Sequence, residues 1–182
     1  MQKNSFQSYC FIKDYNQLEL SKLNKNINII YRNYRKKTKI AEILKIKSFC
    51  KKKKLNLYIS NDIKAALKFK LDGIYIPSFN KQINYIKYTL PKKFQILGSA
   101  HNKYEVFVKY KQGCRLIFLS PIFEVTKKKS YLNIAKFNLL TLNNKSHFIA
   151  LGGINEKNIR KLSLLNIIGY AGISYFQKKT AP

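Results

Sequence analysis

Near the C-terminus, an apolar run ends in two glycines and is followed by a helical pattern. Residues 148–151 have the composition of a buried strand, Gly152 and Gly153 follow at once, and apolar side chains then recur at helical spacing to residue 165. Glycine lets the backbone turn sharply and approach a ligand without an intervening Cβ. The unpaired N–H groups of such a turn attract anions such as phosphate. A similar turn at residues 169–173 indicates two successive strand–turn units, as at the end of a βα barrel.

The same alternation of strand and helix runs through the whole chain. Strand patterns occupy residues 9–12, 27–31, 55–59, 73–76, 94–97, 116–119, 148–151 and 169–173. Helical patterns occupy residues 17–23, 38–53, 63–70, 82–88, 103–111, 132–142 and 155–165. Repeated βα units indicate a parallel sheet, and eight of them predict a (β/α)8 TIM barrel.

The length of the chain limits this barrel. The 182 residues are enough for one domain with a sizeable core, so residues 1–182 are predicted to form a single barrel domain. An eightfold barrel more commonly needs about 250 residues. We therefore expect a small barrel with a shortened first βα unit and without a helix after the last strand.

The charge of the chain is extreme, at +28 from 36 basic and 8 acidic residues. Such a charge is typical of nucleic-acid-binding proteins. However, only four of the basic residues are arginine, the side chain that base and phosphate recognition favours. Lys, Asn, Ile, Tyr and Phe are abundant and have codons rich in A and T, so nucleotide bias accounts for the charge. We expect no specific nucleic-acid binding and keep a lysine-rich RNA-associated protein as a remote alternative.

Membrane insertion and disulfide stabilisation are not expected either. No apolar run approaches the ~20 residues of a membrane span, and the N-terminus has no signal-peptide core. Cys10, Cys50 and Cys114 are odd in number, far apart and without zinc-site spacing. They are interpreted as reduced, mostly buried thiols of a cytoplasmic protein.

Five segments, in order and at consistent spacing, resemble the thiamine phosphate synthase family, which also contains a thiazole tautomerase branch. They are residues 71–76, 98–101, 120–127, 150–154 and 169–173. The resemblance implies a βα barrel whose ligands are small phosphorylated heterocycles. It also implies a transferase reaction of thiamine biosynthesis, in which hydroxymethylpyrimidine pyrophosphate loses its pyrophosphate and thiazole phosphate attacks the resulting cation. Mg²⁺ steadies the departing pyrophosphate in that reaction.

The resemblance also assigns residues to the site. The candidate phosphate-binding residues are Arg32, Thr126, Lys127, Gly152, Gly153, Gly172 and Ser174. The candidate catalytic residues are His101, Ser99 and Lys127. The family's Gln-x-Arg-Glu-Lys pattern is replaced around Arg32 by residues 31–34, Tyr-Arg-Asn-Tyr.

The acidic ligands that the resemblance implies for Mg²⁺ are incomplete. Asp62 is the candidate metal ligand, although the spacing to residues 72–73 fits the family better if Asn61 stands at that place. The usual second aspartate is replaced by Asn80. A hard cation usually needs one or two carboxylates, so weakened Mg²⁺ binding is expected. In the tautomerase branch, a histidine at the place of His101 moves protons on a thiazole carboxylate phosphate, without metal or pyrophosphate. A tautomerase-like enzyme, or a catalytically degenerate protein that still binds phosphate ligands, is therefore the main alternative.

Overall fold

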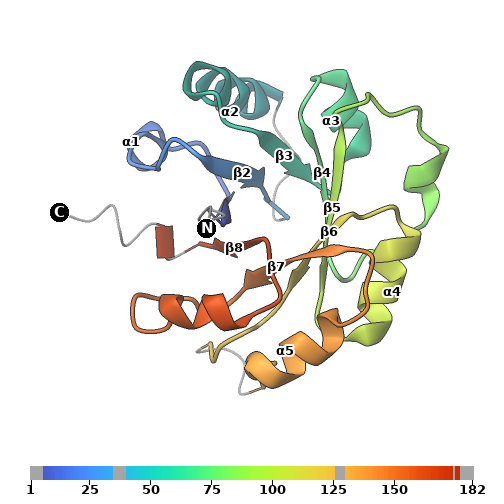
Figure 1. Cartoon of the computed structure of the whole chain (residues 1–182). Helices are drawn as coiled ribbons and strands as arrows, with labels where there is room; N and C mark the ends of the chain where they lie inside the picture. Colours follow the sequence, from blue (N-terminus) through green and yellow to red (C-terminus); the bar gives the residue numbers. More distant parts are fainter. Residues whose placement is uncertain (1–5, 35–39, 126–129, 174, 177–182) are drawn as a thin grey trace.

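Eight parallel strands close into a barrel, in chain order (Figure 1). The computed structural model describes residues 6–34, 40–125, 130–173 and 175–176. The strands are β1 (Gln7–Ile12), β2 (Ile27–Tyr31), β3 (Leu57–Ser60), β4 (Gly73–Ile76), β5 (Gln95–Ala100), β6 (Leu116–Leu119), β7 (His147–Leu151) and β8 (Gly169–Gly172). Closure comes from the pairing of β1 with β8, in which Gln7 lies opposite Gly169. The predicted TIM-barrel architecture is confirmed.

Helices surround the barrel on its outside (Figure 1). They are α1 (Gln17–Ser21), α2 (Ile40–Lys53), α3 (Ile63–Lys68), α4 (Lys103–Lys111) and α5 (Asn133–Thr141). The α1 helix has only five residues, so the first βα unit is short, as predicted. No helix in the described part of the chain is long and apolar enough to cross a membrane. Tyr175 and Phe176, shortly after β8, are helical, and the residues after Phe176 lie outside the described ones, so the expected absence of a final helix stays a prediction.

Two of the predicted helices are short 3-10 helices, so the bounds predicted for them, residues 82–88 and 155–165, were too wide. They are η1 (Asn84–Lys87) and η2 (Ile159–Leu164). In the second case the Asn155 side chain accepts hydrogen bonds from the backbone N–H groups of Lys157 and Asn158, at 2.9 and 3.2 Å. Asn16 makes the same pair of bonds at the start of α1, and the carbonyl of Asn155 accepts from the N–H of Ile159 at 2.9 Å. Asn155 therefore starts the turn, and the 3-10 helix itself begins at Ile159.

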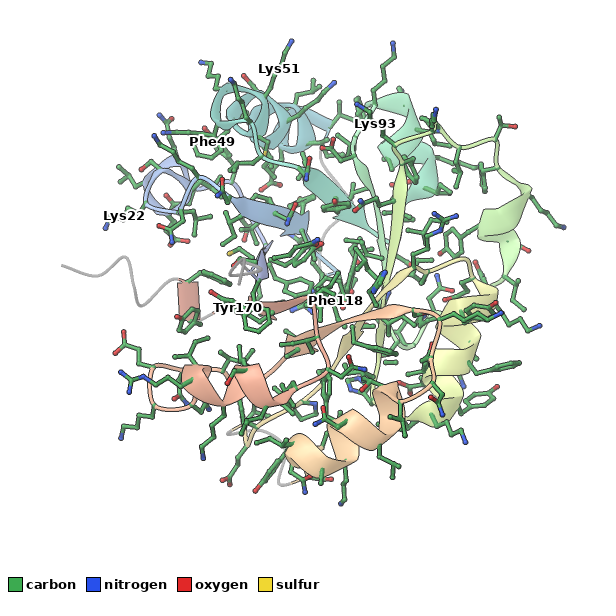
Figure 2. All side chains as sticks on the ribbon, in the orientation of Figure 1. Lys22, Phe49, Lys51, Lys93, Phe118 and Tyr170 are labelled. Carbon is green, nitrogen blue, oxygen red and sulfur yellow. The ribbon has the colours of Figure 1, made fainter. Side chains whose placement is uncertain are left out.

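The inside of the barrel is filled by aromatic rings. Phe118 lies at its centre (Figure 2), and its ring meets those of Tyr9 and Tyr75 edge-on, with centroids 5.1 and 5.5 Å apart. Phe11 and Tyr58 belong to the same buried cluster. Burial raises the pKa of Tyr75 to about 12. A core packed in this way leaves no channel, so ligands must bind at one of the two ends.

A second apolar layer lies between the strands and the helices. It includes Ile29 on β2, Ile46 on α2 and Phe137 on α5, each shielded from solvent. The three cysteines are also buried and unpaired, as predicted. Burial raises the pKa of the Cys10, Cys50 and Cys114 thiols to about 12. Thiols in such surroundings are chemically inert and serve as small apolar side chains.

Candidate active site at the carboxyl end of the barrel

Polar side chains lie at the carboxyl ends of several strands, on the side that faces the inside of the barrel. Alternate residues of a strand face the same side, and Ile30, Tyr58, Leu97 and Phe118 belong to the cluster inside the barrel. The residues two positions further along these strands therefore face the inside at the carboxyl ends. They are Arg32, Ser60, Ser99 and Ser120. This end of a TIM barrel is the one that carries active sites.

Arg32 brings a positive charge to this end. Its guanidinium carbon lies 4.5 Å from the ring centroid of Phe11 and 5.9 Å from that of Tyr34. Its backbone N–H donates to the carbonyl of Ile12 at 2.8 Å, which fixes the chain just beyond β2. Cation–π contacts and a bond to Tyr75 orient the guanidinium. The structure thus places Arg32 at the carboxyl ends of the strands, and its predicted phosphate contact stays a prediction.

Ser99 contacts the aromatic cluster inside the barrel. Its side chain is nearly inaccessible to solvent and hydrogen-bonds with the hydroxyl of Tyr75. Burial raises the pKa of Tyr75, while the bonds to Ser99 and Arg32 act in the opposite direction. Ser99 therefore supports the top of the aromatic core, and the catalytic role predicted for it stays a prediction.

His101 follows β5 and has a fixed orientation. Its Nδ1 atom lies 2.6 Å from the backbone carbonyl oxygen of Ser120. A carbonyl can only accept, so Nδ1 carries the hydrogen and the Nε2 lone pair is free in the neutral ring. Nε2 lies 3.2 Å from the Ser78 hydroxyl, which then donates to it. The backbone N–H of His101 donates to Glu105 on α4 at 2.7 Å, which anchors the main chain as well.

The loop after β4, which carries Ser78, rests on a buried lysine. Lys109 of α4 has no solvent exposure, and its Nζ donates to the carbonyls of Pro77 and Asn80 at 2.7 Å each. A third bond goes to Oε1 of Gln112 at 2.8 Å. Burial lowers the pKa of Lys109 to about 8. The ammonium group is therefore still protonated at pH 7 and matches its three acceptors.

Gln112 and Gly98 complete this support. The Gln112 side-chain amide donates to the carbonyls of Asn80 and Gln82, at 2.9 and 2.8 Å. Gly98 of β5 makes room for the lysine stem, because a Cβ there would lie 2.8 Å from Cδ of Lys109. The loop over residues 77–82 is thus fixed to α4 through its backbone oxygens. Neither Ser78 nor Lys109 was among the residues predicted for the site.

The glycine turn after β7 is required by packing. Gly152 and Gly153 have φ values of +91° and +74°, a region that disfavours side chains. A Cβ on Gly153 would also lie 2.6 Å from the carbonyl oxygens of both Phe123 and Glu124. The turn therefore lies directly against the loop that follows β6. Thr126 and Lys127 come next in the chain and, like Ser174, lie outside the described residues. Their predicted phosphate contacts stay predictions.

The residues predicted for Mg²⁺ are bonded to other partners. Asp62 is the N-cap of α3, where its Oδ1 accepts from the N–H of Ala65 at 2.9 Å. Asn80 donates through Nδ2 to Oδ1 of Asn61 and lies 2.7 Å from the Tyr85 hydroxyl. Within the described ranges, no three His, Cys, Asp or Glu side chains are grouped so that they could hold a metal ion. This donor set does not fit Mg²⁺, which prefers carboxylates.

Two surface hollows lie at the opposite end of the barrel. Their volumes are about 360 and 1080 Å³, and both are lined by residues at the amino ends of strands, such as Gln7 and Gln95. Gln7 and Gln95 accept hydrogen bonds from the hydroxyls of Tyr9 and Tyr58, at 2.8 and 2.7 Å. These two tyrosine hydroxyls are therefore already paired. Arg32 and His101 are at the carboxyl end, which we take as the functional one.

Fold and site together define a closed βα barrel with polar side chains at the carboxyl ends of its strands, and sequence comparison gives its family. The profile of the family described as thiamine monophosphate synthase matches residues 20–176. The chain belongs to this family. It is 30% identical over 128 residues to the thiamine-phosphate synthase of Prochlorococcus marinus subsp. pastoris, covering 69% of this chain and 36% of that protein. It is 31% identical over 132 residues to that of Clostridium tetani, covering 71% and 63%.

The chain thus spans little more than a third of the length of the Prochlorococcus protein. A solved structure, thiamine phosphate pyrophosphorylase from Pyrococcus furiosus, superposes with a TM-score of 0.74 at 18% identity. The superposition covers 97% of this chain and 93% of that one. At this identity the likeness shows the fold, and it agrees with the closed barrel.

Proposed function

We propose that this chain joins hydroxymethylpyrimidine pyrophosphate to thiazole phosphate, as a thiamine phosphate synthase does. The proposal is supported by the family match over residues 20–176 together with the placement of Arg32 at the carboxyl ends of the strands. The ligands would be small phosphorylated heterocycles, and the protein would act in the cytoplasm, in keeping with its buried free thiols.

The chemical demand of this reaction is charge stabilisation. As pyrophosphate departs, negative charge grows on its oxygens, and fixed cations and N–H donors lower the barrier. Arg32 is such a cation, since its position is fixed by Phe11. Gly152 and Gly153 would offer backbone N–H groups at the same end of the barrel, and Lys127 would add a second cation. No step of this proposal is assigned to a metal, because the donor set at Asn61, Asp62 and Asn80 does not suit one.

A second candidate function is proton transfer on a thiazole carboxylate phosphate, as in the tautomerase branch. The geometry of His101 favours it, since the carbonyl of Ser120 fixes the hydrogen on Nδ1. The Nε2 atom is then the base, and the Ser78 hydroxyl 3.2 Å away can carry the proton to or from it. This chemistry needs phosphate binding but neither pyrophosphate nor a metal.

The condensation is tested by incubating the purified protein with both thiamine precursors, with and without Mg²⁺, and measuring thiamine phosphate by mass spectrometry. Product formation is expected, and Arg32→Ala should reduce it at least tenfold. Arg160→Ala, on the exposed surface of η2, is the matched control and should leave it unchanged. If no product forms even at high protein concentration, the synthase proposal is wrong.

The second candidate has a separate assay. Deuterium exchange from solvent into a thiazole carboxylate phosphate should be catalysed by the wild type and lost in His101→Gln. Exchange that persists in His101→Gln would contradict the role of the imidazole. Product formation in the first assay together with no exchange in the second would leave the synthase as the function.

A further inference from the structure

Two aromatic side chains lie exposed at the functional end of the barrel. Phe79, in the loop after β4, is 64% exposed, and Tyr34, just after β2, is 52% exposed. Their ring centroids are 5.4 Å apart and their planes meet at 74°, an edge-to-face contact. The two residues come from different loops, so the barrel itself brings them together. Large aromatic surface that stays in contact with water at a site is typical of a binding face.

The pair is held in place on both sides. The Tyr34 hydroxyl lies 3.1 Å from the hydroxyl of Ser60, at the end of β3. Phe79 sits between Pro77 and Asn80, whose carbonyls are both bonded to the buried Lys109. A ligand that packs on these rings therefore meets a face whose backbone is already ordered, which reduces the entropy cost of binding.

A cation lies beside the aromatic face. The Arg32 guanidinium is 5.9 Å from the Tyr34 ring centroid and 4.5 Å from that of Phe11, on the barrel side. An aromatic surface next to a guanidinium matches a ligand that joins a flat ring to an anionic group. An aliphatic phosphate would contact only the guanidinium, and a neutral ring would contact only the aromatic surface. The two features together therefore select a ligand that has both a flat ring and an anionic group.

We propose that Phe79 and Tyr34 form a stacking subsite for the ring of a heteroaromatic phosphate whose anionic group binds Arg32. The inference rests on the proposed function only for the choice of ligand class, pyrimidine or thiazole phosphates. It makes the pair a specificity determinant that separates these ligands from sugar phosphates of equal charge.

Exposure alone does not single out this pair. Phe107 on α4 is 56% exposed, and the Lys111 ammonium lies 5.4 Å from its ring centroid. That ring is on the outer surface of a helix, away from the strand ends. Phe107 therefore serves as a matched control: it is an exposed phenylalanine beside a cation, but it is outside the site.

The test is a titration calorimetry comparison of thiazole phosphate with ribose 5-phosphate. The wild type should bind thiazole phosphate more tightly, and Phe79→Ala should reduce that preference by about five- to tenfold, as expected for one lost aromatic contact. Ribose 5-phosphate affinity should not change. Phe79→Tyr should keep the preference, and Phe107→Ala should behave as the wild type, with thermal unfolding confirming that each variant is folded.

The outcomes separate this inference from the proposed function. A wild type that binds both phosphates equally, or neither, overturns the inference, as does a preference that survives in the Phe79→Ala, Tyr34→Leu double variant. A preference that depends on Phe79 in a protein that forms no thiamine phosphate supports the subsite and rejects only the condensation.

Discussion

Replacing Lys109 with methionine should change how the free energy of unfolding depends on pH. Methionine keeps most of the length of the side chain and removes only the ionisable group. In the folded protein, burial lowers the pKa of Lys109 from 10.5 to about 8. Between these two values the folded state has released its proton, while the unfolded state still holds it.

The sign of the effect follows from this difference. Where the unfolded state binds more protons than the folded state, stability rises with pH. The contribution of Lys109 should therefore be least favourable below pH 8 and should rise toward pH 10.5. With about 1.4 kcal/mol for each unit of pKa difference, the wild type should gain about 2 kcal/mol from this group between pH 7 and pH 9.5. Lys109→Met should lack this gain.

Urea unfolding at constant ionic strength, at half-unit steps from pH 7 to pH 9.5, measures this difference. The tyrosines also titrate at alkaline pH, but they are common to both proteins and cancel in the comparison. Lys103→Met, at the exposed start of α4, controls for the loss of one positive charge from a very basic chain. If the difference in the free energy of unfolding between the wild type and Lys109→Met stays constant across this range, Lys109 is not a buried cation. Its ammonium group then does not hold the loop after β4.

Three further results are expected. Gly153→Ala should lower the free energy of unfolding by at least about 2 kcal/mol in urea, because positive φ and two carbonyl contacts oppose a Cβ, whereas Gly172→Ala, with a nearest contact of 3.2 Å, should cost less. Mg²⁺ should raise the melting temperature of the Asn61→Asp, Asn80→Asp double variant but not that of the wild type. Equal shifts in both proteins would refute the inference that these two asparagines replace metal-binding aspartates. Binding to RNA oligonucleotides should be independent of sequence and fall steeply with salt, and retention of one sequence at physiological salt would contradict this.

The barrel could be predicted because its strands are apolar and regularly spaced along the chain. Every expected strand occurs, although β5 extends to Ala100, three residues further than its apolar run indicated. The pattern stops at Gly98, but the ladder with β6 continues through Ser99 and Ala100. The type of helix was harder to predict from the sequence, because the apolar spacing after Asn155 suits both an α-helix and a turn followed by a 3-10 helix.

The site was predictable only where strand ends determine it. Arg32 and His101 follow strands directly, so their place at the carboxyl end follows from the fold. Lys109 was missed because lysine on a helix is ordinarily exposed, and this chain has many. A signal was present, since Lys109 lies three residues after the buried Val106 and so shares the inner face of α4. Phe79 gave no comparable signal, because its partner Tyr34 is 45 residues away in sequence and only the pairing of β2 and β4 with β3 brings the two loops together.

The contact between Asn61 and Asn80 explains how the fold is kept while the metal chemistry is altered. Two carboxylates at these positions would repel each other unless a cation lay between them. Two carboxamides instead bond directly, and Tyr85 adds a further partner, so the loops after β3 and β4 are joined without an ion. In the proposed function, the negative charge of a bound phosphate would then be met by side chains, and Arg32 lies at the strand ends among the described residues. Departure of pyrophosphate would depend on Arg32 together with the lysines of residues 127–129. Product formation by the paired aspartate variant in Mg²⁺, compared with the wild type, tests whether a metal adds to that stabilisation.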